Sequence, residues 1–149
     1  MSRSVKGGTF RRRLHLCRTS AQLQLFGMFY RDMADWVRTS DGGGSFRNAC
    51  YWILPGDGSK GALWRTENPL LGTYNIYVWY GRLPHGHSAT NAHFVVATRR
   101  DSREFMIDQN EDVGKWNLLG KFEDPLYVKV TNKADGPVAI DAVKFERVR

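Results

Sequence analysis

Several aromatic and amide side chains could recognise a carbohydrate. The flat face of an aromatic ring stacks on the apolar face of a sugar ring, and an amide bonds to sugar hydroxyls. The chain has five tryptophans and six tyrosines. Most of the tryptophans fall in segments that look like strands, so we expect the majority of them in the core. Six side chains are the candidates for such contacts: Tyr77, Trp79, Tyr127, Asn75, Asn91 and Gln109.

Acidic and histidine side chains offer weaker chemistry. Asp108 and Asp141 stand in predicted strands, where two carboxylates could hydrolyse a glycosidic bond or bind calcium. Acids in such places more often accept hydrogen bonds from loop backbone, and we favour that interpretation. His85 and His87, with His93 nearby, lack the cysteine or carboxylate partners of a zinc site, and no catalytic Ser/His/Asp order is present. We therefore predict a protein that is not an enzyme and has no metal and no cofactor.

Positive charge is concentrated at the N-terminus. Residues 1–31 hold seven of the 22 basic residues and none of the 15 acidic ones, so the remainder, with 15 basic residues, is formally neutral. Such an arm attracts polyanions, whether a phosphate backbone or an anionic membrane, and the partners we predict for it are nucleic acid or an acidic protein. A solvated extension without a partner is the alternative. The residues predicted to contact a polyanion are Arg11, Arg12, Arg13 and Arg18.

Targeting and redox features leave the compartment open. No stretch approaches the roughly 20 apolar residues that a membrane-spanning helix needs. The apolar run after residues 11–13 is too short for a clear secretory signal, whereas the Arg-rich, acid-free composition fits a mitochondrial transit peptide or a nucleic-acid-binding tail. The arm is thus compatible with an intracellular or mitochondrial location. Cys17 and Cys50 lack metal or redox spacing, and we expect free thiols rather than a disulfide.

The segment that must position the candidate side chains is residues 72–80, which is dense in aromatic and β-branched residues. It predicts a central β-strand that is apolar on both faces. One face carries the even-numbered residues from Tyr74 to Tyr80, and the other carries Tyr77 and Trp79. A strand of this kind usually lies between two layers.

Short apolar segments separated by turns fill the rest of the chain, and residues 20–34 fit either a helix or a first strand. We expect Leu126, Val128 and Val130 on the buried face of one strand. The pattern predicts an all-β fold, a single antiparallel β-sandwich that is jelly-roll-like, with a basic, largely irregular N-terminal arm. The other predicted strands are 36–39, 46–52, 61–65, 92–98, 104–109, 115–122, 126–131 and 138–145.

Several short motifs occur in a characteristic order: Trp36 before a glycine-rich turn, Trp64-Arg65, Gly72-Thr73-Tyr74, Thr90-Asn91-Ala92, Asp108-Gln109, Gly114-Lys115-Trp116-Asn117-Leu118-Leu119-Gly120 and Asp141-Ala142-Val143. Together they resemble the golvesin C-terminal-like domain, which is also found at the C-terminus of xanthan lyases. The resemblance covers about residues 26–149. It divides the chain into a basic arm, 1–24, and a golvesin-like sandwich, 25–149. It implies a β-sandwich like those of carbohydrate-binding modules, appended to secreted enzymes and itself without a catalytic role.

Two functions follow as hypotheses. The first is a non-catalytic binding or scaffolding module, with a polysaccharide or glycan as the ligand class that the resemblance implies. The second is a structural component of a larger assembly, RNA-containing or organellar, anchored by the basic arm. A hydrolase that uses Asp108 or Asp141 ranks third. The sequence leaves the oligomeric state open.

Overall fold

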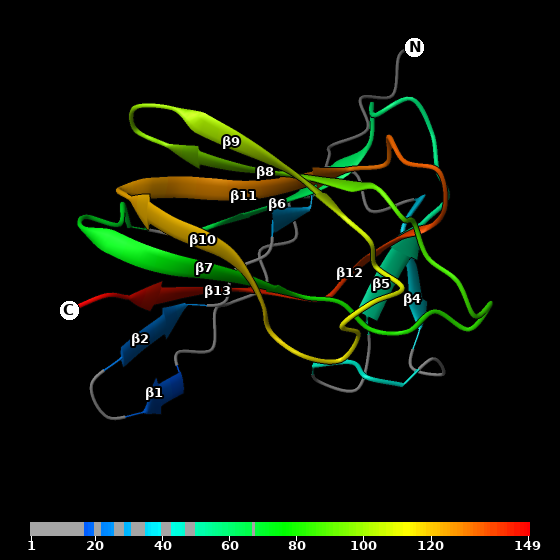
Figure 1. The fold of residues 1–149 in the computed structure, drawn as a ribbon, viewed down its shortest axis with the longest axis horizontal. Coiled ribbons are helices and arrows are strands. Elements are labelled where there is room, and N and C mark those ends of the chain that lie inside the picture. Colours follow the sequence, from blue (N-terminus) through cyan, green and yellow to red (C-terminus); the bar gives the residue numbers. More distant parts are fainter. Residues whose placement is uncertain are drawn as a thin grey trace, which may run out of the picture.

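The strands form two five-stranded sheets and one three-stranded sheet, and every pairing between them is antiparallel (Figure 1). The computed structural model describes residues 17–19, 22–25, 29–30, 35–39, 43–46, 50–66 and 68–149, the first three segments by their backbone alone. Sheet A has the order β1-β2-β13-β7-β10, with the bounds Cys17–Thr19, Gln22–Leu25, Ala142–Arg147, Thr73–Trp79 and Asn117–Glu123. Sheet B has the order β3-β6-β11-β8-β9, with the bounds Phe29–Tyr30, Gly61–Arg65, Pro125–Thr131, Ala92–Thr98 and Ser102–Ile107. Sheet C has the order β12-β5-β4, with the bounds Val138–Ile140, Cys50–Ile53 and Val37–Thr39.

Sheets A and B stack on each other, and sheet C lies at one end of the stack (Figure 1). Side chains from both large sheets fill the space between them. Ile76 and Phe145 come from sheet A and Trp64, Phe94 and Val128 from sheet B, and all are fully buried. Burying a side chain of this size stabilises the fold by about 1.5–3 kcal/mol. The predicted all-β, antiparallel β-sandwich is confirmed.

Strand β7 is the centre of sheet A, as its composition predicts. It lies between β13 and β10. The even-numbered residues from Tyr74 to Tyr80 face the core and are at most 3% exposed. Tyr77 and Trp79 point to the outer face and are half-buried. The predicted assignment of the two faces is confirmed.

The expectation that most of the tryptophans lie in the core is wrong. Trp36 and Trp64 are buried, whereas Trp52, Trp79 and Trp116 are half-buried. Trp79 occupies a strand position that alternates with core residues, and Trp116 precedes its strand. Trp52 packs against the core but is only partly buried there. Three large aromatic side chains therefore remain partly open to solvent.

Other sequence predictions are corrected by local geometry. Leu126 is 41% exposed rather than buried, because the register with β8 shifts between Pro125 and Tyr127 and turns Leu126 outward. The segment predicted as one strand over 138–145 divides at Asp141 into β12 in sheet C and β13 in sheet A. The described parts of 20–34 are strands and not a helix. Strand β1 and most of β2 fall within residues 1–24, and the division at residue 25 stays a prediction.

Candidate functional site

Four aromatic rings gather around the outer face of sheet A and form what we call the aromatic cluster: Phe46, Tyr77, Trp79 and Trp116. The ring centroids of Phe46 and Trp79 are 5.3 Å apart, those of Phe46 and Trp116 5.0 Å, and those of Trp79 and Trp116 5.3 Å. The interplanar angles of these three pairs are 60–79°, so each contact is edge to face, the arrangement that aromatic quadrupoles favour. Three segments that are distant in sequence thus build one rigid surface.

Lys144 joins the cluster to a carboxylate. It lies across from Tyr77 in the β13–β7 pairing, and its Nζ is 4.1 Å from the centroid of the Tyr77 ring and 5.1 Å from that of Trp116. Lys144 is only 8% exposed, and its charge is balanced by Glu146, with Nζ and Oε1 3.7 Å apart. The Tyr77 hydroxyl donates to Oε2 of the same Glu146 at 3.0 Å. Burial, with the Glu146 carboxylate beside it, raises the pKa of Tyr77, which therefore stays neutral.

Polar and exposed side chains continue this face beyond the rings. Asn75, one of the predicted residues, is half-buried and pairs across the sheet with Lys121 on β10 and Glu146 on β13. Leu118 pairs with Tyr77 from β10 and is 58% exposed. The outer face of sheet A thus carries aromatic rings at one end and amide and charged groups at the other.

Backbone contacts hold the cluster in place. The indole Nε1 of Trp79 donates to the carbonyl of Gly44 at 2.7 Å. Gly44 has a φ of 71°, and a Cβ there would lie 3.2 Å from the Cα of Gly114, so both the conformation and the close approach require glycine. The backbone N–H of Phe46 donates to Oδ2 of Asp141 at 2.6 Å. Burial raises the pKa of Asp141 to about 6 against the opposing effect of that hydrogen bond.

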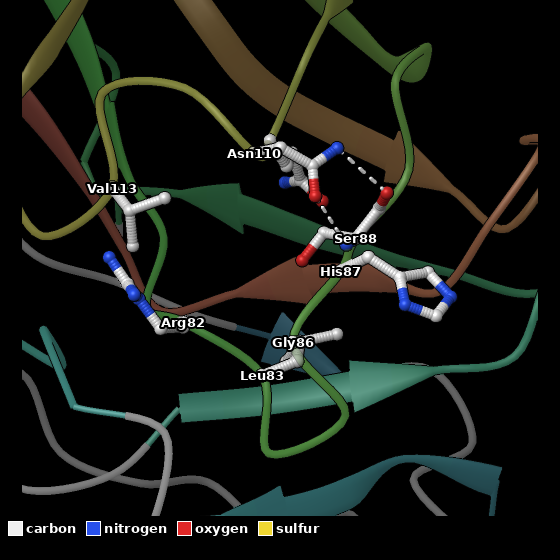
Figure 2. A pocket seen from close by; sticks show the side chains of 8 residues that line it. Arg82, Leu83, Gly86, His87, Ser88, Asn110 and Val113 are labelled. Atoms are coloured by element: carbon white, nitrogen blue, oxygen red, sulfur yellow. Dashed lines mark hydrogen bonds between the residues drawn. The ribbon is translucent and has the colours of Figure 1, made fainter.

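Two hollows adjoin Arg82, which follows β7. One, of about 310 Å³, is lined by Gly43, Gly44, Arg82 and Val113. The other, of about 130 Å³, runs from Arg82 and Val113 to Ser88 and Asn110. Figure 2 shows the Arg82 guanidinium on one side of the second hollow, beside Val113, and the Ser88–Asn110 pair on the other. The Asn110 amide bonds to the backbone of Ser88 twice, at 2.7 and 2.9 Å.

The outer face of sheet B carries a shallow hollow of about 500 Å³. His93 and Glu104, from β8 and β9, are 3.1 Å apart there, and Met106 is 66% exposed. Asn91 accepts a hydrogen bond from the backbone N–H of Asp135 at 2.8 Å, which ties two loops together. The side chains around this hollow are Asn91, His93, Glu104, Met106, Lys133 and Asp135.

Comparisons with known proteins now identify the domain. The model of the golvesin C-terminal domain matches residues 28–147. The chain belongs to the golvesin C-terminal domain family. A search of curated protein sequences finds no match.

One solved structure shows the fold of this golvesin C-terminal domain within a larger protein. A structure of Paenibacillus xanthan lyase matches with a TM-score of 0.65 and 22% identity, over 83% of this chain and 13% of that one. The chain therefore corresponds to a small part of the lyase. The CBM22-1 and GH10 modules of Clostridium thermocellum endo-1,4-β-D-xylanase 10B, complexed with xylohexaose, match with a TM-score of 0.42 and 12% identity, over 83% of this chain and 26% of that one.

In the golvesin domain, the six residues predicted to contact a carbohydrate do not share one surface. Tyr77, Trp79 and Asn75 share the outer face of sheet A, whereas Tyr127 points to the outer face of sheet B and Asn91 lines the hollow there. Gln109 is 1% exposed, and its amide bonds to both the N–H and the C=O of Ala139, at 2.8 and 2.7 Å. It completes the free edge of β12 and offers its amide to no ligand.

The polyanion contacts predicted in the arm fall largely outside the described residues. Arg11, Arg12 and Arg13 are not described, and Arg18 lies in β1, where the structure describes the backbone alone. These contacts stay a prediction.

Several residues of these surfaces were not among those predicted from the sequence. Phe46, Trp116 and Lys144 join the aromatic cluster, and Arg82 adjoins both hollows. The alternation of β13 places Lys144 and Glu146 on one face, which is a usable signal. The position of Phe46 had no signal, because its partner Asp141 is 95 residues away.

The remaining candidates for chemistry have structural partners. Asp108 accepts hydrogen bonds from the N–H and the Nδ2 of Asn110 at 2.9 and 2.8 Å, and the His85 ring packs edge-on against Trp52 at 5.0 Å. Cys50 is a buried free thiol whose pKa is raised by burial. Among the described residues, no group of three His, Cys, Asp or Glu could hold a metal ion. Nor does the described part of the chain contain a helix long and apolar enough to cross a membrane.

Proposed function

We propose that this golvesin C-terminal domain is a non-catalytic carbohydrate-binding module and that a sugar chain lies on the outer face of sheet A. The observation that carries the proposal is the aromatic cluster, in which Tyr77, Trp79 and Trp116 remain half-buried at the surface while hydrogen bonds and ring contacts fix their orientation. A preorganised aromatic surface binds with little loss of side-chain entropy. Asn75, Lys121 and Glu146, along the same strands, supply donors and acceptors for hydroxyl groups.

The acids on and near this face support a role in binding rather than catalysis. Asp141 accepts the Phe46 N–H, and Glu146 holds the Tyr77 hydroxyl and the Lys144 ammonium. The Asp108 carboxylate accepts two hydrogen bonds from Asn110. Two-carboxylate hydrolysis requires an acid and a base or nucleophile that face a common space. Each of these carboxylates instead serves to orient a neighbouring group.

Adsorption to polysaccharides tests the proposal. The full chain is mixed with insoluble or immobilised polysaccharides, xanthan and xylan included, and the unbound fraction is measured. Leu118→Arg places a long charged side chain beside Tyr77 without disturbing the core, since Leu118 is 58% exposed. We expect it to weaken adsorption to a neutral polymer, for which the added charge brings no attraction, at least tenfold, equivalent to about 1.4 kcal/mol.

Met106→Arg is the matched control, because Met106 is 66% exposed on the outer face of sheet B. It makes the same change of size and charge on the opposite side of the sandwich. Retained adsorption in this variant would locate binding on sheet A. If Met106→Arg weakens adsorption and Leu118→Arg does not, the ligand lies in the sheet B hollow, and the assignment to the aromatic cluster is wrong.

A second function is favoured by a different observation, the concentration of excess positive charge in residues 1–31. In this alternative the arm anchors the domain to RNA or to an acidic partner in a larger assembly. Replacing Arg11, Arg12 and Arg13 by Gln in the full chain removes three charges. If the arm is the anchor, retention on an RNA column falls in this variant and depends steeply on salt, whereas Leu118→Arg leaves it unchanged.

A further inference from the structure

Arg82 has an unusual position among the charged residues that the structure describes. It is exposed, and its guanidinium makes no hydrogen bond or ion pair with any described residue. Among the described side chains that line the two hollows adjoining it, Arg82 is also the one that is formally charged at neutral pH. An unpaired guanidinium presents planar donors that match the two oxygens of a carboxylate.

The wall opposite Arg82 is polar and fixed. The Ser88 hydroxyl has no hydrogen-bond partner among the described residues, and Figure 2 shows it directed into the hollow. The Asn110 side chain behind it is held by the Ser88 backbone. Two acids of the neighbouring loop are engaged elsewhere, since Asp108 binds Asn110 and Asp112 lies 2.6 Å from the Lys115 ammonium. The third acid of this loop, Glu111, is exposed and does not line either hollow. Among the residues that the structure describes, no carboxylate in the lining would therefore repel an anionic group.

The hollows are continuous with the aromatic cluster. The carbonyl that accepts the Trp79 indole N–H belongs to Gly44, and Gly44 lines the larger hollow. The backbone N–H of Arg82 donates to the neighbouring Gly43 carbonyl at 3.0 Å. Arg82 follows Trp79 by three residues, which span at most about 10 Å. A sugar chain with one residue on the Trp79 ring would thus bring a neighbouring residue to Arg82.

We infer that Arg82 binds the carboxylate of an acidic sugar residue and that the ligand of this domain is a polysaccharide containing uronic acid. The inference rests on the proposed function and adds the ligand class. The carboxylate accepts hydrogen bonds from the guanidinium N–H groups of Arg82. The Ser88 hydroxyl donates a hydrogen bond to the carboxylate or to an adjacent sugar oxygen. The glycines that line the hollows leave the space for this residue.

The test compares acidic polysaccharides with their carboxyl-reduced forms, in which each uronic acid becomes a neutral hexose on the same backbone. Polygalacturonate, alginate and glucuronoxylan serve as probes, and affinity is measured for the full chain. We expect a preference for the acidic form that Arg82→Gln abolishes, with a loss of roughly 10- to 100-fold, the usual range for a hydrogen-bonded charge. Arg82→Lys keeps the charge without the fork, and we expect it to restore only part of the affinity.

Two matched variants separate this site from general attraction to polyanions. Arg99→Gln removes the same charge from the exposed turn between β8 and β9, and replacing Arg11, Arg12 and Arg13 by Gln weakens the arm. Binding to dextran sulfate, a dense polyanion without carboxylates, measures the general attraction of the arm to polyanions. The inference is overturned if Arg82→Gln and Arg99→Gln have equal effects, or if neutral polymers bind as well as acidic ones. If neutral polymers bind as well as acidic ones but Leu118→Arg weakens their binding, the proposed function stands and only the inference about acidic sugars is wrong. If the chain binds no polysaccharide, both the inference and the proposed function are wrong.

Discussion

The outer faces of the two large sheets use their side chains in opposite ways. On sheet A, Trp79 and Trp116 contact each other, and Lys144 lies over Tyr77, so each ring is positioned by another. On sheet B, Tyr127 makes no ring contact with a described residue, and Met106 stands 66% exposed beside an open hollow. A surface whose groups hold each other is ready for a rigid ligand, because little freedom remains to be lost on binding. This difference is why we place the ligand on sheet A.

The largest expected effect on stability comes from removing a ring of the aromatic cluster, and removing a ring from sheet B provides the comparison. Trp79→Ala deletes two edge-to-face contacts and the hydrogen bond to Gly44, and we expect a loss of about 3 kcal/mol in the free energy of unfolding. Tyr127→Ala deletes a half-buried ring without such partners, and we expect a loss of about 1 kcal/mol. Urea denaturation of the two variants measures both values. Equal losses would contradict the idea that only sheet A carries an interlocked surface.

A second effect, which depends on pH and at most equals the first, is expected at Asp141, whose carboxylate holds the Phe46 N–H. Its pKa is about 6 in the folded protein against 3.8 as the ordinary value, so the folded state holds the proton more tightly. The stabilisation from the protonated carboxyl is complete below pH 3.8 and is lost as the pH rises through 6. The free energy of unfolding should fall over this range by up to about 3 kcal/mol from this group.

Asp141→Asn tests this sign. The amide is neutral at every pH and its oxygen still accepts the Phe46 N–H, so we expect the variant to be more stable than the parent at pH 7 and equal to it near pH 4. Urea denaturation between pH 4 and pH 8 measures the difference. A variant that is less stable at pH 7 would show that the ionised carboxylate contributes favourably to the Phe46 turn.

The smallest expected effect lies on sheet B. Glu104→Gln removes the charge of a carboxylate that is 68% exposed and lies 3.1 Å from the His93 ring. Exposed pairs of this kind contribute about 0.2–1 kcal/mol, and we expect a loss at the lower end of that range. Thermal unfolding of the variant beside the parent checks this. A loss comparable to that of Trp79→Ala would remove the contrast between the two faces.

The sequence by itself determined the local features of this protein. The alternation of apolar residues assigned the two faces of β7, and the bounds of β6 and β8 match the predicted segments. This succeeds because successive side chains on a strand point to opposite faces, whatever the strand pairs with. The ordered motifs likewise indicated the family that the comparison now shows.

Only the tertiary structure decided which side chains share a surface. It placed Tyr127 on the face opposite Tyr77, buried Gln109 against Ala139, and brought Phe46 to the cluster through Asp141, 95 residues away. The order of strands in a sheet and the closure of loops depend on burying the whole core at once, and no short window of residues contains that information. Local alternation says which way a side chain points, but the packing of the two sheets says what it meets there.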